Sequence, residues 1–348
     1  MDKSKTVRVL IVEDSLNVRM LLKKLLEEDP VIVVIGSASN PYEAADLIAR
    51  EVPDVITLDL EMPRMNGLTF LKRLMNQHPL PVVVVSSFTE ERRELAIEAL
   101  ALGASEIITK PALPAAEEII NFGIRLREAV HAASIQNLLL RRISQRKVLS
   151  TVEYSYRPRT DNNKLILIGA STGGTELISS ILKSARSDLP PVLVVQHMPG
   201  EFTGVFAKRL NTESSLTVKE AEKNELLRNG HVYIANGFYH LVVKKTTNDY
   251  VCDLNDGELV NRHRPSVDVL FFSAADFAAE NVMAILLTGM GTDGARGMLE
   301  LKRKGAICIA QEEKSCAVYG MPREAVMLDA VTLTGPPSSI IEWMNNFA

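Results

Sequence analysis

Short apolar runs of strand length alternate with helix-periodic segments over the first part of the chain. The expected strands are Val7 to Val12, Val31 to Ile35, Val55 to Leu58, Val82 to Val85 and Ile107 to Thr109. Between them, apolar residues recur at the spacing of amphipathic helices, which we expect to begin near Leu16, Pro41, Leu68, Arg92 and Ala115. Five strands with intervening helices predict a parallel, doubly wound sheet.

The second part of the chain repeats this alternation and then interrupts it. The main strand-type runs are Leu165 to Ile168, Val192 to Gln196, Val282 to Leu287 and Ala306 to Ala310. A β-rich insert lies in the middle and consists of Val232 to Ala235, Leu241 to Lys245 and Tyr250 to Leu254. We therefore expect a second doubly wound, mostly parallel α/β domain that carries an antiparallel hairpin at one edge of its sheet.

A basic segment without apolar periodicity separates the two patterned regions. Its positive residues are Arg141, Arg142, Arg146, Lys147, Arg157, Arg159 and Lys164. We expect a domain over residues 1–130, a linker over 131–164 and a second domain over 165–348. The charge of the linker is typical of a solvated tether, and docking to an acidic partner is the alternative.

Composition narrows the class of protein. A chain of 348 residues with 46% hydrophobic residues is long and apolar enough for two folded domains. The net charge of −4 gives no general reason to bind nucleic acid. No run of 18 apolar residues and no apolar leader are present, so we expect a cytoplasmic protein without membrane insertion. Three cysteines without metal-binding spacing are expected to be reduced.

Polar residues follow the strands of the first domain, at the sheet edge where ligands of parallel sheets bind. Glu13 and Asp14 follow the first strand, Asp59 the third, Ser86 the fourth and Lys110 the fifth. Converging carboxylates form a site for a hard divalent cation such as Mg²⁺. Asp59 could then attack a phosphoryl donor, and Ser86 and Lys110 would hold the new phosphoryl oxygens. The alternative is that these acidic residues only cap helices.

In these motifs the first domain resembles the receiver domain of bacterial response regulators. The matching runs are Leu58 to Gly67 and Thr109 to Pro111. The resemblance implies a five-stranded, flavodoxin-like domain that is phosphorylated on Asp59. Ile107 stands where receivers usually carry Tyr or Phe. The resemblance also implies that Mg²⁺ is bound by Glu13, Asp14, Asp59 and Glu61.

A serine stands in a glycine-rich turn after the first strand of the second domain. Ser171 follows Gly169-Ala170 and precedes Thr172-Gly173-Gly174. At such a strand-to-helix turn, backbone N–H groups and the helix dipole can stabilise an oxyanion beside a nucleophilic hydroxyl. The same turn could instead bind a phosphate, although the lysine of a P-loop is missing.

His197 and Asp293 follow two other strands of the same domain. Taken singly, His197 is typical of a structural residue and Asp293 of a helix N-cap. Parallel strands, however, would bring both residues to the rim that carries Ser171, where a Ser-His-Asp triad could assemble. This order along the chain differs from those of the α/β-hydrolases, chymotrypsin and subtilisin.

Five runs of the second domain match the sequence of one known family. They are Ile168 to Thr175, Gln196 to Pro199, Arg262 to Asp268, Leu287 to Gly294 and Tyr319 to Pro322. In these runs the domain resembles the catalytic domain of the chemotaxis protein-glutamate methylesterase (CheB) family. The resemblance implies Ser171 as nucleophile, His197 as general base, Asp293 as the residue that orients the imidazole, and the Met290 backbone N–H as oxyanion donor. It implies no cofactor for ester hydrolysis.

Together the two resemblances imply a phosphorylation-activated enzyme of bacterial chemotaxis. Its substrates would be glutamyl methyl esters on methyl-accepting chemoreceptors, giving glutamate and methanol, and it would also deamidate receptor glutamine. A chemotaxis histidine kinase would be the phosphodonor. The unphosphorylated receiver would inhibit the catalytic cleft. The rival hypothesis is a response regulator whose second domain binds phosphate; a DNA-binding output has no helix-turn-helix to support it.

Other polar residues of the second domain are harder to assign. Arg262, His263 and Arg264 precede a proline and are interpreted either as a solvated turn or as a contact with an acidic receptor surface. His231 and His240 lie in the β-rich insert and are interpreted as structural residues.

Overall fold

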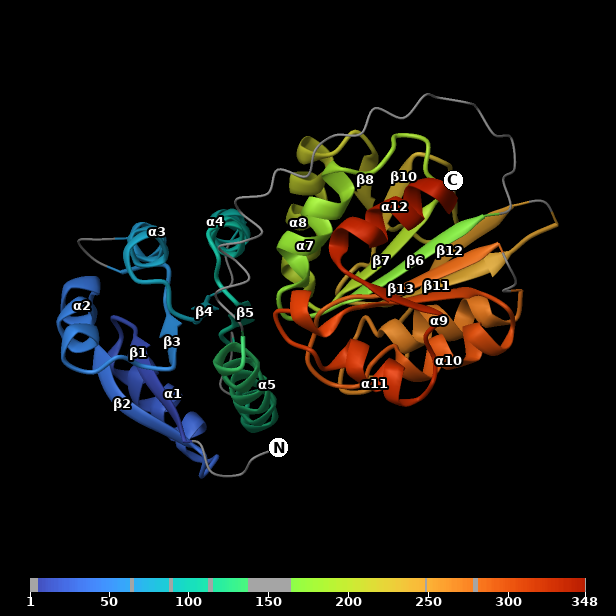
Figure 1. Ribbon diagram of the computed structural model, residues 1–348. Helices are drawn as coiled ribbons and strands as arrows, with labels where there is room; N and C mark the ends of the chain where they lie inside the picture. Colours follow the sequence, from blue (N-terminus) through green and yellow to red (C-terminus); the bar gives the residue numbers. More distant parts are fainter. Residues whose placement is uncertain are drawn as a thin grey trace. The chain divides into compact units, whose positions relative to one another are not determined.

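The computed structural model describes residues 6–62, 66–87, 90–111, 115–136, 164–247, 249–277 and 281–347. The chain divides into two compact units, residues 1–141 and 142–348 (Figure 1). Most of the expected linker, residues 137–163, lies outside the described residues. None of the helices within these ranges is both long and apolar enough to cross a bilayer.

The first unit is a parallel sheet with helices between its strands. The strands are β1 (Val7–Val12), β2 (Ile32–Ala38), β3 (Val55–Leu58), β4 (Val82–Ser86) and β5 (Glu106–Thr109), and the helices are α1 (Leu16–Glu27), α2 (Pro41–Arg50), α3 (Gly67–Gln77), α4 (Glu90–Ala101) and α5 (Ala116–Ser134). The sheet order is β2-β1-β3-β4-β5, and all pairs are parallel. The predicted five-stranded parallel fold is confirmed.

The core of the first unit explains why β1, β3 and β4 are almost entirely apolar. These strands pair on both sides and carry helices on the sheet faces, so nearly all of their residues are buried. A fully covered parallel strand leaves no face for polar residues until it ends. Polar side chains therefore gather where the strands end, with Glu13 directly after β1 and Asp59 directly after β3.

The second unit contains a seven-stranded parallel sheet. Its strands are β6 (Leu165–Ala170), β7 (Val192–Gln196), β8 (Thr217–Glu220), β10 (His231–Ile234), β13 (Val282–Leu286), β14 (Ile307–Gln311) and β15 (Leu333–Gly335). Their order is β15-β14-β13-β6-β7-β10-β8. The helices are α7 (Gly174–Lys183), α8 (Gly200–Glu213), α9 (Val267–Ala275), α10 (Ala295–Arg303), α11 (Met321–Met327) and α12 (Pro337–Phe347). In Figure 1, α7, α8 and α12 cover one face of the sheet, and α9, α10 and α11 cover the other.

The β-rich insert differs in detail from the prediction. Its first run forms β10, which is no part of a hairpin and pairs in parallel with β7 and β8. The other two runs form the hairpin β11 (His240–Lys245) and β12 (Tyr250–Asn255), which joins β9 (Glu225–Leu226) in a separate antiparallel sheet. The expected hairpin exists, but its expected place at an edge of the parallel sheet is wrong.

The reason for this placement is the apolar face of the hairpin. Leu241 and Val243 of β11 belong to the same buried cluster as Leu270 and Phe271 of α9. Packing against α9 removes this apolar face from water, which favours the hairpin in this position. The hairpin therefore covers α9. The segment that connects β12 to α9 reaches Asp293, which follows β13.

Candidate active site

Ser171 and His197 follow two adjacent strands at the same level. Ala170 of β6 pairs with Gln196 of β7, so the next residue of each strand leaves the sheet at the same rim. The backbone N–H of His197 donates to the carbonyl of Ala170 at 3.0 Å. The structure therefore brings the two predicted residues to neighbouring positions, and only 8% of Ser171 is exposed.

His197 is hydrogen-bonded to Asp293, which follows β13 on the other side of β6. Its Nε2 lies 2.8 Å from Asp293 Oδ2, and the His197 side chain is 6% exposed. Because a carboxylate only accepts, Nε2 carries the hydrogen and Nδ1 is the basic nitrogen of the neutral ring. Nδ1 is buried and has no hydrogen-bond partner among the described residues.

Asp293 is held at the amino terminus of α9 rather than at the helix that follows it. Gly294, in left-handed conformation, is the N-cap of α10, so the alternative of Asp293 as the N-cap there is wrong. Besides His197, its carboxylate accepts hydrogen bonds from four groups: Ser266 Oγ at 2.7 Å, the backbone N–H groups of Val267 and Asp268 at 2.7 and 3.2 Å, and Asn261 Nδ2 at 2.8 Å.

These donors keep the Asp293 carboxylate charged. Burial alone would raise its pKa, but the hydrogen bonds and the nearby imidazole outweigh that cost and hold the pKa of Asp293 well below its ordinary value. The positive end of the α9 dipole acts in the same direction. Asp293 is therefore a fixed anion beside His197, suited to orient the ring and to stabilise it when it becomes protonated.

The turn after β6 is built so that Ser171 faces a second backbone segment. The Ser171 N–H donates to the Thr288 carbonyl at 3.0 Å. A Cβ at Gly289 would lie 2.7 Å from Ser171 Cβ, so only glycine permits this approach. The segment is fixed in turn by the Gly289 N–H, which donates to Val318. Met290, the predicted oxyanion donor, directly follows this contact, and its N–H donates to no other group within the described part of the chain.

Three residues that contact Ser171, His197 or Asp293 were not predicted from the sequence. The Gln196 amide donates to the carbonyls of both Ser171 and His197, each at 3.0 Å. The His263 ring stacks on the His197 ring, and Asn261 reaches Asp293. The motif containing His263 was the available signal, but spacing along the chain could not show which residue it contacts.

The two histidines of the β-rich insert have the surroundings of structural residues. His240 is buried, with Nε2 2.8 Å from the Glu258 carbonyl and Nδ1 accepting from the Ser266 N–H. His231 lies 3.1 Å from the Asn229 carbonyl. The thiols of Cys252, Cys308 and Cys316 are free and buried, and burial raises the pKa of each. They therefore have little thiolate character.

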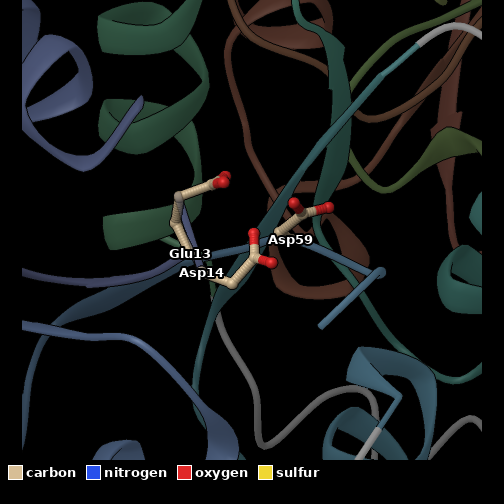
Figure 2. A group of neighbouring side chains, drawn as sticks. All are labelled: Glu13, Asp14 and Asp59. Carbon is tan, nitrogen blue, oxygen red and sulfur yellow. The ribbon is translucent and has the colours of Figure 1, made fainter. Parts of the chain in front are cut away.

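The rim of the first unit carries the predicted acidic cluster. Carboxylate oxygens of Glu13, Asp14 and Asp59 lie within 4.8 Å of one another (Figure 2). Lys110 Nζ lies 2.6 Å from Glu13 Oε2 and 2.7 Å from Asp59 Oδ2. Burial raises the pKa of Glu13, and Lys110 offsets part of this shift. An all-oxygen set of this kind suits Mg²⁺.

Ser86 and Glu61 hold different positions around this cluster. Ser86 is buried at the end of β4, and its Oγ lies 3.4 Å from the Ser87 carbonyl. Glu61 is exposed, and its carboxylate is not in the group of neighbouring carboxylates. Its backbone N–H donates to Asp59 Oδ1 at 3.2 Å, so the structure gives Glu61 a backbone contact with the site.

Two family models match this chain, one in each of its two units. Residues 166–344 match the model described as CheB methylesterase, and residues 9–121 match that of the response regulator receiver domain.

Similar proteins extend over nearly the whole chain. A protein-glutamate methylesterase/protein-glutamine glutaminase of group 3 operon from Rhodopseudomonas palustris is 44% identical over 348 residues, covering 97% of this chain and 96% of that protein. A protein-glutamate methylesterase/protein-glutamine glutaminase from Methylobacillus flagellatus is 43% identical, covering 97% of each. The crystal structure of the Thermotoga maritima CheB methylesterase catalytic domain aligns with TM-score 0.52 and 36% identity, covering 53% of this chain and 98% of that chain.

Proposed function

This chain belongs to the CheB methylesterase family and carries a response regulator receiver domain before its esterase domain, and from that premise we propose a triad mechanism and a mode of control. The enzyme is a protein-glutamate methylesterase and protein-glutamine glutaminase. Its substrates are glutamyl methyl esters and glutamines on methyl-accepting chemoreceptors, and it acts in the cytoplasm. Residues 1–130 form the receiver domain, 131–164 the linker and 165–348 the esterase domain.

Ester hydrolysis begins with attack by Ser171 Oγ on the ester carbonyl. His197 Nδ1 takes the hydroxyl proton, and Asp293 stabilises the imidazolium that results. The Met290 N–H receives the oxyanion, a contact worth about 3 to 4 kcal/mol in comparable enzymes. His197 then returns the proton to the departing methanol, and water hydrolyses the acyl-enzyme by the same route. Deamidation of glutamine uses the same steps with ammonia as the leaving group.

The observation that carries this proposal is the state of the His197 ring. Nε2 is 2.8 Å from an ionised carboxylate, and the buried Nδ1 has no partner among the described residues. A structural histidine would be expected to use both nitrogens, as His240 does. The unpaired Nδ1 lies on the residue that neighbours Ser171 across β6 and β7, which suits proton transfer from the serine.

The rival phosphate-binding function has less support. A phosphate at the glycine-rich turn would need free backbone N–H groups. The Ser171 N–H already donates to Thr288, and the Gly174 N–H donates to the Ser171 carbonyl. Two of the backbone N–H groups of this turn are therefore already used within the protein.

Control comes from the receiver. Asp59 accepts a phosphoryl group from a chemotaxis histidine kinase, and Ser86 and Lys110 bind the phosphoryl oxygens. Glu13, Asp14 and Asp59 would hold Mg²⁺, which neutralises charge during phosphoryl transfer. The Glu61 carboxylate is the weaker candidate of the proposed ligands, since it lies outside that group. The unphosphorylated receiver inhibits the esterase domain, and phosphorylation relieves this inhibition.

A fluorophosphonate probe tests the proposed nucleophile directly. We expect covalent modification of the full-length protein at Ser171, identified by mass spectrometry of its peptides, and no modification of Ser171→Ala. Ser179→Ala, which alters a buried serine on α7, is the matched control and should be labelled like the wild type. A wild-type protein that stays unlabelled, or is labelled elsewhere, would favour the phosphate-binding function.

A further inference from the structure

The segment Val260–His263 forms a tight turn beside the His197–Asp293 pair. Val260 and His263 exchange backbone hydrogen bonds in both directions, at 3.1 and 2.9 Å. The two residues between them, Asn261 and Arg262, have φ of 51° and 67°. Positive φ at both central residues is typical of a type I′ turn, in which asparagine is favoured and arginine is strained. The chain keeps this costly backbone next to its proposed catalytic base.

Asn261, the first central residue, contacts two buried carboxylates at once. Its Nδ2 donates to Asp293 Oδ1 and to Asp268 Oδ2, both at 2.8 Å. Asp268 is itself held by the Gly297 N–H at 2.7 Å. The Asn261 amide thereby links the Asp293 carboxylate to the fixed carboxylate of Asp268 on α9.

His263, the last residue of the turn, contacts the other member of the pair. Its ring lies parallel to the His197 ring, with centroids 3.8 Å apart and planes 10° apart. A flat ring at this distance blocks rotation of the His197 ring and keeps water from one of its faces. Four consecutive residues thus place one side chain on Asp293 and another on His197.

We propose that the Val260–His263 turn positions the general base. Asn261 fixes the Asp293 carboxylate, and His263 fixes the plane of the His197 ring, so that Nε2 stays on Asp293 and Nδ1 stays oriented toward the nucleophile. Both are positioning residues that act through the pair. The inference rests on the proposed triad. It also gives a reason for the stacking of His263 on the His197 ring, which a turn that only faced solvent would not need.

Three substitutions of His263 test whether the flat shape of its side chain positions the His197 ring. In the full-length protein we expect His263→Ala to lower kcat for methylated receptor, and the rate of fluorophosphonate labelling of Ser171, by about tenfold or more, with KM unchanged within about twofold. His263→Phe should restore both rates to within about threefold of wild type, since it keeps a flat ring. His263→Leu has bulk without flatness and should not restore them.

The amide at residue 261 is tested separately from its backbone. Asn261→Gly accepts a positive φ at least as well as asparagine and removes the two hydrogen bonds. We expect a fall in kcat and labelling rate of about tenfold.

His231→Ala is the matched control for His263→Ala. His231 also lies against an aromatic ring, that of Tyr233 at 6.1 Å, but it contacts neither His197 nor Asp293 among the described residues. It should behave like the wild type.

The results separate this inference from the proposed function. An unlabelled wild-type protein would overturn the triad and this inference with it. A labelled wild type with unchanged rates in His263→Ala and Asn261→Gly would overturn the positioning role alone. So would equal losses in the Phe, Leu and Ala variants, or a rise in KM at constant kcat. Thermal unfolding, followed by the fluorescence of Trp343, identifies variants that lose folded protein. At equal stability, the comparison of His263→Phe with His263→Leu still tests the positioning role.

Discussion

The two units place an aspartate at the carboxyl end of a parallel sheet, and the surroundings give each aspartate a different chemistry. Within the described part of the chain, Asp59 accepts hydrogen bonds from two groups, Lys110 and the Glu61 N–H, and lies among other carboxylates. Asp293 accepts from five groups, and its carboxylate is 1% exposed. A carboxylate with oxygen lone pairs left over can bind a cation and act as a nucleophile, whereas one whose lone pairs are all used can only orient and stabilise its partner. The same sheet architecture thus supports the proposed phosphorylation site in one unit and the fixed anion of the proposed triad in the other.

The largest expected effect tests the role of Asp293. In Asp293→Asn, the amide N–H₂ would donate to His197 Nε2, moving the ring hydrogen to Nδ1, so that the ring could no longer take the Ser171 proton. We expect kcat for methanol release to fall by about 10⁴-fold. Methanol release from methylated receptor membranes measures this. A loss of less than about tenfold in a folded variant would contradict the assigned role.

The matching change in the receiver should leave basal catalysis intact. Asp59→Asn removes the phosphoryl acceptor, so we expect a small phosphodonor with Mg²⁺ to stimulate the wild type roughly tenfold and the variant not at all. Asp46→Asn, at an exposed position on α2, is the control and should respond like the wild type. Stimulation of Asp59→Asn by the phosphodonor would show that the receiver signals by another residue.

Removal of the receiver separates inhibition from chemistry. A variant lacking residues 1–150 should hydrolyse methyl esters several-fold faster than the unphosphorylated full-length protein and should not respond to a phosphodonor. A truncated protein no faster than the unphosphorylated full chain would contradict inhibition by the receiver.

The smallest effect concerns stability. The pKa of Asp293 is lower in the folded protein than its ordinary value, so the folded state binds fewer protons. Its contribution to stability is therefore complete above a pH of about 4 and is lost as the pH falls further. The stability advantage of wild type over Asp293→Asn should shrink by about 1 kcal/mol between pH of about 6 and about 3. Urea unfolding followed by Trp343, the sole tryptophan and a residue of α12, reports on the second unit. An advantage that grows toward low pH would contradict the assigned charge.

Local patterns predicted the elements of this fold better than their partners. Strands such as Val55–Leu58 and Val192–Gln196 were predicted with their observed bounds, because fully buried strands are apolar from end to end. The run at β10 was recognised as a strand but assigned to the wrong sheet, since an isolated apolar run does not reveal what pairs with it. Its partners β7 and β8 are fixed by the packing of the whole unit.

The candidate site shows the same limit. Ser171, His197 and Asp293 could be selected because each follows a strand, and strand ends of a parallel sheet converge. The groups around Asp293 could not, because Ser266 and Asn261 reach it from a segment some distance away in the sequence. Stacking of His263 on His197 depends on positive φ at Asn261 and Arg262, and no local sequence pattern predicts this stacking.

The central claim is that Ser171, His197 and Asp293 act as one catalytic unit, and a double-mutant measurement tests it most directly. Methanol release is compared among wild type, Ser171→Ala, His197→Ala and the double variant. Residues that share one proton-transfer step lose their activity together, so we predict that the double variant retains the same residual rate as Ser171→Ala within about threefold. Losses that multiply, leaving the double variant far below either single variant, would contradict the account.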